Sequence, residues 1–255
     1  MSEGDFVWYD VMTTDVEAAE KFYANVVGWQ MRDSGMPGQR YTLIMDGEQQ
    51  IGGIMPIPAE AEGVPPAWMG YVGVADLDGK ARQLVELGGT VHRGPQDIPG
   101  VGRFAVVGDP QGAGFLLFEP APGSAQVPAQ LMAYKSIGWR ELHAGDFDSV
   151  WPFYERLFGW RKVDAHDMGA FVYQTFATDG EMAIGGMMTK MPDAPHPFWA
   201  YYISVENIDD AVARARENGG TTLMEPHQVP GGMFICPMRD PQGAHFSLIG
   251  PRTTL

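Results

Sequence analysis

The hydrophobic pattern of the first 58 residues changes its period several times, and each change marks an expected element. Residues 6–13 alternate with the period of a strand. Residues 16–27 place apolar side chains at helical spacing between Asp15, a favoured N-cap residue, and Gly28, a favoured helix stop. Shorter strands are expected at 29–33, 41–46 and 51–57. The pattern therefore predicts a βαβββ module.

The same order of elements recurs along the chain. The segment "WMGYVGV" predicts a strand, and Asp76 or Asp78 caps the helix that follows. The segment "GRFAVVGDPQGAGFLLFEP" predicts a hairpin, because its Asp-Pro-Gln-Gly turn places Pro and Gly where a β-turn favours them. Residues 138–160 then repeat residues 7–29 at an offset of 131, which also carries "DPQGA" from 109–113 onto 240–244. The shared offset indicates a duplicated domain.

The duplication predicts an α+β fold of four βαβββ modules in two pairs. We expect an N-terminal domain over residues 1–122, a linker over 123–136 and a C-terminal domain over 137–255. Each domain can bury its own core, because 45% of the 255 residues are hydrophobic.

Charge and cysteine content narrow the function classes. The formal net charge of −15 argues against a nucleic-acid or membrane partner, since both need a basic surface. The single cysteine, Cys236, excludes an intramolecular disulfide and a multi-thiolate metal site. No apolar run approaches the roughly 18 residues of a membrane span. We therefore expect a cytoplasmic protein, monomeric or homodimeric, whose partner is a small-molecule ligand.

The chain resembles the vicinal oxygen chelate superfamily in three features. These are the order of elements, the "FY…GW" motif at the first helix of each half, and the "DPQGA" motif before the last strand of each half. That superfamily includes glyoxalase I, bleomycin and fosfomycin resistance proteins and extradiol dioxygenases. The resemblance implies that two modules pair into a curved mixed sheet, a cup flanked by helices whose concave face holds a ligand. We expect each half of the chain to form one such cup, and the alternative is an exchange of modules between the halves.

In the enzymes of this superfamily, the resemblance implies a divalent metal held by His, Glu or Gln from the first and last strands. The matching positions here carry weak ligands: Trp8, Met69, Leu116, Trp139, Ala200 and Ser247. We therefore predict no metal in the first cup. In the second half, Glu141 and His143 point to one face of a strand, so with His227 and His245 they form a metal set if they converge. The alternative, which we favour, is a hydrogen-bonded Glu141–His143 pair without a metal.

Aromatic and polar side chains on the expected cup strands predict a site for a planar or apolar small molecule. The predicted ligand-contacting residues are Trp8, Met12, Tyr41, Tyr71, Arg103, Trp139, Tyr202, His245 and Ser247. The predicted catalytic residues are Glu141, His143 and Asp10, because a carboxylate among aromatic rings has a raised pKa that suits a general acid or base. A neighbouring tyrosine capping the carboxylate is the alternative. Two glycine pairs, Gly52-Gly53 and Gly185-Gly186, let the strand bend or let another group approach the backbone.

The sequence thus favours a tandem glyoxalase-like protein that binds a small hydrophobic or aromatic metabolite without the usual metal, either sequestering it or acting on it by acid–base chemistry. One alternative is a metal-dependent lyase or dioxygenase whose active cup, with its divalent metal, lies in the C-terminal half. Another is a non-catalytic scaffold in which Trp8 and Trp139 fill the cups as core.

Overall fold

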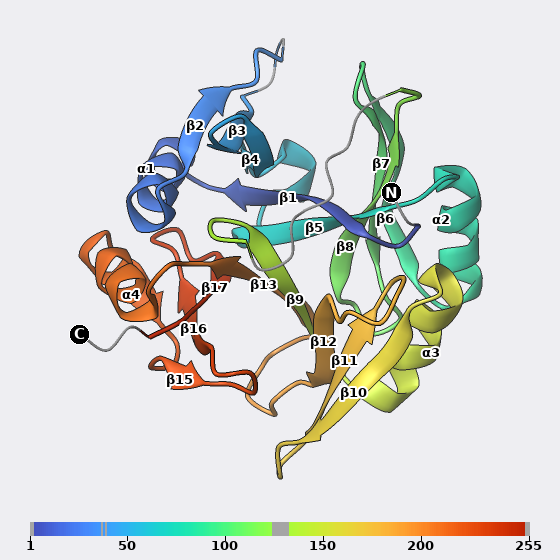
Figure 1. The fold of residues 1–255 in the computed structure, drawn as a ribbon. Coiled ribbons are helices and arrows are strands. Elements are labelled where there is room, and N and C mark those ends of the chain that lie inside the picture. Colours follow the sequence, from blue (N-terminus) through green and yellow to red (C-terminus); the bar gives the residue numbers. More distant parts are fainter. Residues whose placement is uncertain (1–2, 37, 39, 124–132, 253–255) are drawn as a thin grey trace. The chain divides into compact units, whose positions relative to one another are not determined.

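The computed structural model describes residues 3–36, 38, 40–123 and 133–252, and within them the four βαβββ modules follow one another (Figure 1). Module 1 contains β1 (Phe6–Thr13), α1 (Val16–Val27), β2 (Gln30–Asp33), β3 (Thr42–Asp46) and β4 (Gln49–Pro56). Module 2, after a short 3₁₀ turn at Ala59–Ala61, contains β5 (Ala67–Gly73), α2 (Leu77–Glu86), β6 (Thr90–Ile98), β7 (Gly102–Gly108) and β8 (Gly114–Pro120).

The second half repeats this order, with one addition. Module 3 contains β9 (Ile137–Ala144), α3 (Phe147–Phe158), β10 (Arg161–Asp167), β11 (Val172–Ala177) and β12 (Gly185–Thr189). Module 4 contains β13 (Phe198–Ser204), α4 (Ile208–Glu217), β14 (Thr221–Thr222), β15 (His227–Gln228), β16 (Phe234–Arg239) and β17 (His245–Gly250). The short strand β15 is extra; it pairs with β16 off the main order of the sheet.

The strands form two mixed sheets, one in each half of the chain. The order is β2-β3-β4-β1-β5-β8-β7-β6 in the first half and β10-β11-β12-β9-β13-β17-β16-β14 in the second. Within each module the first strand and the last pair in parallel, as β1 does with β4, while the remaining neighbours are antiparallel. The predicted α+β fold of four βαβββ modules is confirmed.

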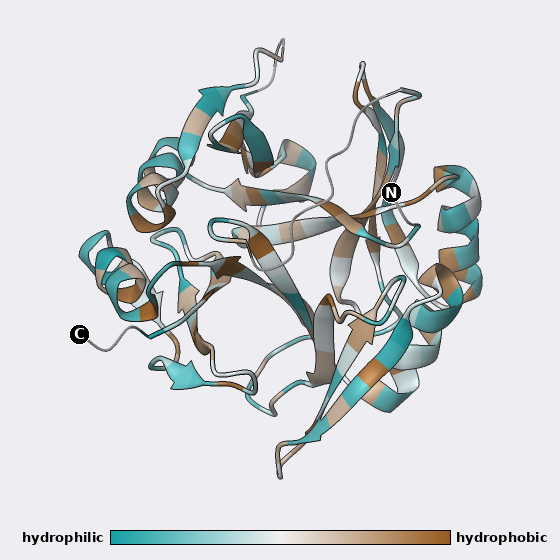
Figure 2. Ribbon diagram, in the orientation of Figure 1, coloured by the Kyte–Doolittle hydropathy of each residue, from teal (hydrophilic) through white to brown (hydrophobic). Residues whose placement is uncertain are grey.

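Helices α1 and α2 begin at the aspartates expected to cap them. The Asp15 side chain accepts a hydrogen bond from the Ala18 amide at 3.0 Å, and Gly28 ends α1 in the left-handed conformation at φ 81°. Asp76, the first of the two predicted candidates, caps α2. Each helix carries hydrophobic and hydrophilic residues, as α1 and α4 show in Figure 2, and the buried residues of these two helices are hydrophobic.

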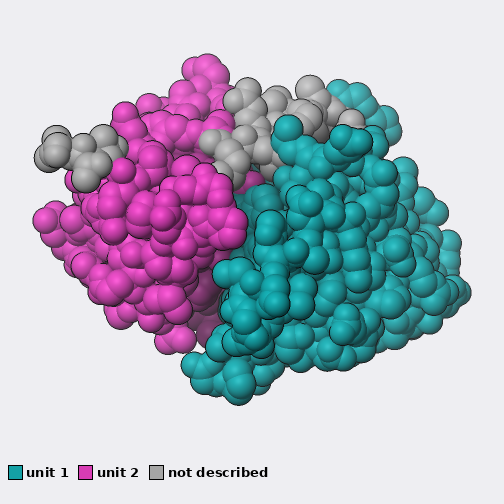
Figure 3. All heavy atoms as spheres, turned by 60° about the horizontal axis from the view of Figure 1, so that its bottom comes forward, with its two compact units in different colours: residues 1–8, 70–129, 139–200 teal, residues 9–69, 130–138, 201–255 magenta. Residues whose placement is uncertain are grey.

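The modules pack into two compact units, and each unit draws on both halves of the chain (Figure 3). Unit 1 comprises residues 1–8, 70–129 and 139–200, in which α2 contacts α3. Unit 2 comprises residues 9–69, 130–138 and 201–255, in which α1 contacts α4. The predicted domain boundaries stay a prediction, and most of the predicted linker, residues 124–132, lies outside the described residues.

A buried Trp–Tyr–Asp triad joins three modules in each unit. In unit 2, Trp68 Nε1 donates to the Tyr23 hydroxyl at 2.8 Å, and that hydroxyl donates to Asp240 at 3.0 Å. In unit 1, Trp199 Nε1 donates to the Tyr154 hydroxyl at 3.2 Å, and Tyr154 donates to Asp109 at 2.9 Å. The triads thus link the "FY" motif of one half to the "DPQGA" turn of the other.

The aspartate of each triad also organises its own turn. One oxygen of Asp109 accepts from the backbone amides of Gln111 and Ala113, and Asp240 holds the amides of Gln242 and Ala244 in the same way. Burial raises the pKa of both carboxyls, although these hydrogen bonds oppose the rise. The pKa of Tyr23 is raised by burial and by the adjacent Asp240. No helix among the described residues has the length and apolarity to cross a bilayer.

Candidate functional site

Strand β9 has two different faces, and the polar candidates lie on the one away from the core. Leu142 and Ala144 alternate with the candidates and are fully buried. Trp139 and His143 are half-buried on the opposite face, with Glu141 between them. The alternation of the strand therefore presents an aromatic ring, a carboxylate and an imidazole side by side, as the sequence predicts.

These side chains form a connected chain of hydrogen bonds, which we call the C-terminal centre: Trp139, Tyr173, Glu141 and His143. Trp139 Nε1 donates to the Tyr173 hydroxyl at 2.8 Å, and Tyr173 is hydrogen-bonded to the Glu141 carboxylate. Glu141 Oε1 lies 2.8 Å from His143 Nε2. The predicted Glu141–His143 pair is confirmed as hydrogen-bonded.

A glycine makes the Tyr173 contact possible. Tyr173 lies on β11, whereas Glu141 lies on β9, and the intervening strand β12 places Gly186 directly beside Glu141. A Cβ at Gly186 would collide with the phenol ring of Tyr173. The phenol therefore crosses β12 over a bare backbone, which confirms the prediction that this glycine pair admits a neighbouring group.

Two further features define the electrostatics and orientation of this centre. Burial of the Tyr173 hydroxyl, with the adjacent Glu141 carboxylate, holds the pKa of Tyr173 well above its usual value. The phenol therefore stays protonated and can serve as a hydrogen-bond donor. The His143 ring stacks on Phe198, with centroids 4.4 Å apart and planes 5° from parallel. The side chains of Glu141 and His143 are 10% and 17% exposed.

Module 1 carries a related arrangement in unit 2, which we call the N-terminal centre: Asp10, Met12 and Tyr41. The Tyr41 hydroxyl donates to Asp10 Oδ1 at 2.7 Å, and a Cβ at Gly53 would collide with both partners. The alternative that a tyrosine caps the carboxylate is thereby confirmed. Met12, half-buried, occupies the position that His143 holds in module 3. Trp8, also half-buried, precedes Asp10 by two residues on β1.

The structure separates Tyr71 from Arg103, two further predicted ligand contacts. Tyr71 is buried and packs against Phe104 and Phe118 on one face of module 2. Arg103 is the neighbour of Phe104 on β7, so it points to the opposite face, where it pairs with Asp78 of α2 at 2.8 Å and with Asp97 at 3.1 Å. Arg103 therefore contacts the helix side of the sheet.

The remaining predicted ligand contacts lie on module 4. Tyr202 on β13 pairs with Ser247 on β17, and both are buried. The Ser247 hydroxyl has no hydrogen-bond partner among the described residues. His245 is half-buried at the first position of β17, opposite Arg239.

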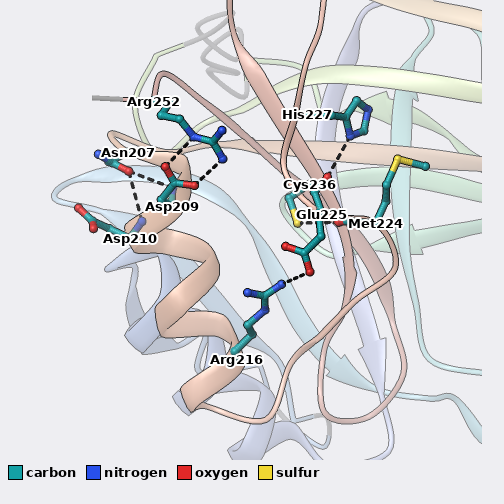
Figure 4. Close-up of polar contacts among 9 residues, drawn as sticks. All are labelled: Asn207, Asp209, Asp210, Arg216, Met224, Glu225, His227, Cys236 and Arg252. Atoms are coloured by element: carbon teal, nitrogen blue, oxygen red, sulfur yellow. Dashed lines mark hydrogen bonds and ion pairs between the residues drawn. The ribbon is translucent and has the colours of Figure 1, made fainter. Parts of the chain in front are cut away.

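His227 and Cys236 also belong to module 4, and both are held by carbonyl groups of one loop (Figure 4). His227 Nδ1 lies 3.1 Å from the Glu225 carbonyl, and Cys236 Sγ donates to the Met224 carbonyl at 3.2 Å. Burial raises the pKa of the Cys236 thiol to about 11, so the thiol is a poor nucleophile. Figure 4 also shows Arg252 paired with Asp209 in the first turn of α4.

The donor set does not fit the metal that the fold implies. Within residues 3–36, 38, 40–123 and 133–252, no group of three or more His, Cys, Asp or Glu side chains is arranged to hold a metal ion. The Glu141 carboxylate is hydrogen-bonded to both His143 and Tyr173. A glutamate and a histidine alone fall short of the three protein ligands typical of a catalytic transition-metal site.

Sequence reasoning missed Tyr173 and Phe198, although one signal was present for the tyrosine. The offset between the halves is 131 at Trp29 and Trp160 but 133 at Gly53 and Gly186. The counterpart of Tyr41 therefore lies between these offsets, at residue 173. No comparable signal marks Phe198, because its contact with His143 joins two different modules.

The chain matches the family model described as "Glyoxalase/Bleomycin resistance protein/Dioxygenase superfamily" twice, over residues 5–117 and 136–248. Among curated proteins, it is 32% identical to "Putative glyoxylase CFP32" of Mycobacterium tuberculosis (strain CDC 1551 / Oshkosh), covering 96% of this chain and 94% of that protein. It is 28% identical to "Anthracycline biosynthesis protein DauV" of Streptomyces sp. (strain C5), covering 95% and 91%.

Solved structures share the fold at low sequence identity. The 2,2',3-trihydroxybiphenyl 1,2-dioxygenase of Sphingomonas wittichii strain RW1 superposes with a TM-score of 0.68 at 13% identity, covering 100% of this chain and 92% of that one. The Mn(II)-bound glyoxalase of Novosphingobium aromaticivorans gives 0.65 at 16% identity, covering 99% and 83%. At these identities the likeness extends to the fold alone.

Proposed function

Because the chain belongs to the Glyoxalase/Bleomycin resistance protein/Dioxygenase superfamily, we propose that it binds a small aromatic or hydrophobic metabolite and transfers protons at the C-terminal centre without a bound metal. The observation that carries this proposal is the hydrogen-bonded chain from Trp139 through Tyr173 and Glu141 to His143.

The chemistry of these side chains suits proton transfer. Glutamate and histidine are frequent general acids and bases, and a linked pair can hold or release a proton at a defined atom. The ring of Trp139 and the stacked rings of His143 and Phe198 are aromatic groups close to the Glu141 carboxylate. A planar ligand with one polar group matches this combination.

The donor set favours metal-independent chemistry over the metal-dependent alternative. Glu141 and His143 are hydrogen-bonded to each other. At the first-strand position where the superfamily resemblance places a metal ligand, this chain has Trp139. The curated relatives support work on small molecules: one is named as a glyoxylase and another as an anthracycline biosynthesis protein. We propose a small-molecule enzyme rather than a scaffold.

The test measures hydrogen exchange in a panel of small aromatic ketones, with 2-hydroxyacetophenone as the reference probe. Purified protein is dialysed against a chelator, its metal content is measured, and α-hydrogen exchange into D₂O is followed by NMR. We expect exchange catalysed by metal-free protein, and a loss on the order of 10²–10⁴-fold in the double variant Glu141→Gln/His143→Gln, the range for general acid–base catalysis.

A matched control is available on module 4. Glu225 and His227 are also two residues apart, and Glu225 is exposed and paired with Arg216. The variant Glu225→Gln/His227→Gln should keep the wild-type exchange rate. Exchange that disappears with the chelator and returns with Mn²⁺ would establish the metal-dependent alternative instead, and failure of the whole panel to bind or exchange would overturn the proposal.

A further inference from the structure

We propose that Nδ1 of His143 is the proton-accepting atom, that Glu141 and Tyr173 are positioning residues, and that the N-terminal centre does not transfer protons. This inference rests on the proposed function and assigns atoms and roles within it. It replaces the simpler view that Glu141 and His143 are interchangeable bases.

The hydrogen bond to Glu141 fixes the tautomer of His143. An ionised carboxylate can only accept hydrogen bonds, so the 2.8 Å contact between Glu141 Oε1 and His143 Nε2 requires the proton on Nε2. A neutral imidazole carries a single ring proton. Its lone pair available to a substrate is therefore on Nδ1.

Tyr173 fixes the role of the Glu141 carboxylate as a hydrogen-bond acceptor. Its raised pKa keeps the phenol protonated, so it donates to the carboxylate rather than accepting from it. Trp139 Nε1 in turn donates to the phenol oxygen at 2.8 Å, which fixes the direction of the Tyr173 hydroxyl. Every hydrogen bond in this chain therefore points toward Glu141, and the carboxylate acts on the substrate through His143.

The ring plane of His143 is held independently of its hydrogen bond. Phe198 stacks on one face of the imidazole at 4.4 Å and 5°, and β9 pairs with β12 at His143 and Met188. The imidazole thus has a defined plane and a defined tautomer, and 17% of its side chain remains exposed. Orientation of this kind is what a general base needs before substrate arrives.

The N-terminal centre lacks the atom that this role requires. It keeps the tyrosine–carboxylate pair, since Tyr41 donates to Asp10 at 2.7 Å. Met12 stands where module 3 has His143, and a thioether sulfur is a weak acceptor that does not take a proton at neutral pH. The two centres therefore share a tyrosine–carboxylate pair but differ in the base.

A neutral base facing an aromatic surface suits an aromatic ketone with acidic α-hydrogens. The C–H bond breaks, its electron pair stays on the substrate as the enolate, and the proton moves to Nδ1. The imidazolium formed is stabilised by the Glu141 carboxylate, as in other carboxylate–histidine pairs. Return of a proton or deuteron from the imidazolium to the carbon restores both partners.

The first test reads the tautomer in the wild-type protein and needs no activity. In ¹⁵N-labelled protein, the His143 ring is assigned by the signal lost in His143→Met, one of six histidines. We expect Nε2 in the protonated range and Nδ1 in the unprotonated range near neutral pH. A protonated Nδ1 in the neutral ring would overturn the inference.

The variant Glu141→Gln gives the sharpest prediction. Tyr173 would donate to the amide oxygen, which turns the amide NH₂ toward His143 and makes Nε2 an acceptor. The proton then moves to Nδ1, so the ¹⁵N signals exchange character and the exchange rate of 2-hydroxyacetophenone falls on the order of 10²–10⁴-fold. A purely structural role for Glu141 would lower stability without reversing the tautomer.

The variant His143→Met separates the two centres, because it gives the C-terminal centre the residue that the N-terminal centre has at this position. His143→Met should lose exchange to the same extent as Glu141→Gln, while circular dichroism confirms the fold. Wild-type-level exchange in His143→Met would overturn this inference but leave the proposed function standing with another base. Absence of exchange in the wild-type protein would instead defeat the proposed function, whatever the tautomer of His143.

Discussion

The two halves of the chain keep one polar network unchanged and let another diverge. The Trp–Tyr–Asp triads use the same residue types at the same offset, with Tyr23, Trp68 and Asp109 matched by Tyr154, Trp199 and Asp240. The N-terminal and C-terminal centres differ: Asp10 corresponds to Glu141, and Met12 corresponds to His143. The comparison teaches that the triads serve the packing that both halves need, whereas the residues of the centres vary between the halves.

The difference has a physical cause. In each triad the tyrosine hydroxyl both accepts from a Trp N–H and donates to an aspartate, so a change in any member leaves buried groups unpaired. At the centres, only the tyrosine, the carboxylate and the glycine beneath them are coupled sterically. The position of His143 lies beyond that coupled set and is therefore free to differ.

The largest effect is expected from removing a triad aspartate. Asp109→Ala and Asp240→Ala each leave a tyrosine hydroxyl and two turn amides without their acceptor, so each should lower the free energy of unfolding by about 2–5 kcal/mol. Urea unfolding measures the change. Asp97→Ala, at an exposed ion pair, should shift stability by less than about 0.5 kcal/mol. Loss in one triad but not in the other would break the claim that both are structural.

An intermediate effect is expected from filling the glycine cradles. Gly53→Ala and Gly186→Ala place a methyl group against Tyr41 and Tyr173, and each should cost about 1–3 kcal/mol through overpacking. Gly186→Ala should also detach Tyr173 from Glu141, which is visible as a change in fluorescence of the adjacent Trp139. Gly94→Ala is the control, because no atom lies within 4 Å of its added Cβ. Unchanged stability in both variants would show that the tyrosines do not need the bare backbone.

The smallest effect is a pH dependence. The pKa of Asp240 is raised by burial above its unfolded value of 3.8, so its stabilising contribution is complete below pH 3.8 and is lost as pH rises through the folded pKa. Wild-type protein should therefore lose stability relative to Asp240→Asn as pH rises above 3.8, as measured by urea midpoints.

The pH dependence of stability that is expected from Asp78 has the opposite sign. Its hydrogen bond to Arg103 lowers the pKa of Asp78, so its contribution is present above pH 3.8 and is lost as pH falls. The difference between wild type and Asp78→Asn should therefore grow with rising pH in the acidic range. A wild-type advantage over Asp240→Asn that also grows with pH would contradict the assigned role of burial.

Local patterns predicted the modules well, and non-local contacts set the limit. The strand period, the Asp15 cap and the turn at Asp109 are short-range signals, and each predicted the element that forms. The sequence predicts that a tyrosine can cap such a carboxylate, but it does not identify Tyr173 as the partner of Glu141. Tyr173 lies on another strand, at a position where the offset between the halves has changed. The face of Arg103 depends on hairpin register, and composition carries no information on it.

The assembly of modules into units was beyond sequence reasoning for the same reason. The repeat shows that there are four modules, but modules 1 and 3 carry one set of motifs and modules 2 and 4 another, so the sequence does not state which helix contacts which. The contacts of α1 with α4 and of α2 with α3 depend on side chains such as Tyr23, whose partner is 217 residues away.

That separation has a consequence for how the protein is made. Tyr154 and Asp109 close a loop of 45 residues, whereas Tyr23 and Asp240 close one of 217. Since loop-closure entropy scales as (3/2)RT ln n, the longer closure costs about 1.4 kcal/mol more from a disordered chain. During synthesis, unit 1 has all its residues once the ribosome passes position 200, but the aromatic face of α1 waits for the final module. A nascent chain stalled before residue 240 therefore lacks Phe246, on which the rings of Phe22 and Tyr23 both pack, and lacks the acceptor of the Tyr23 hydroxyl.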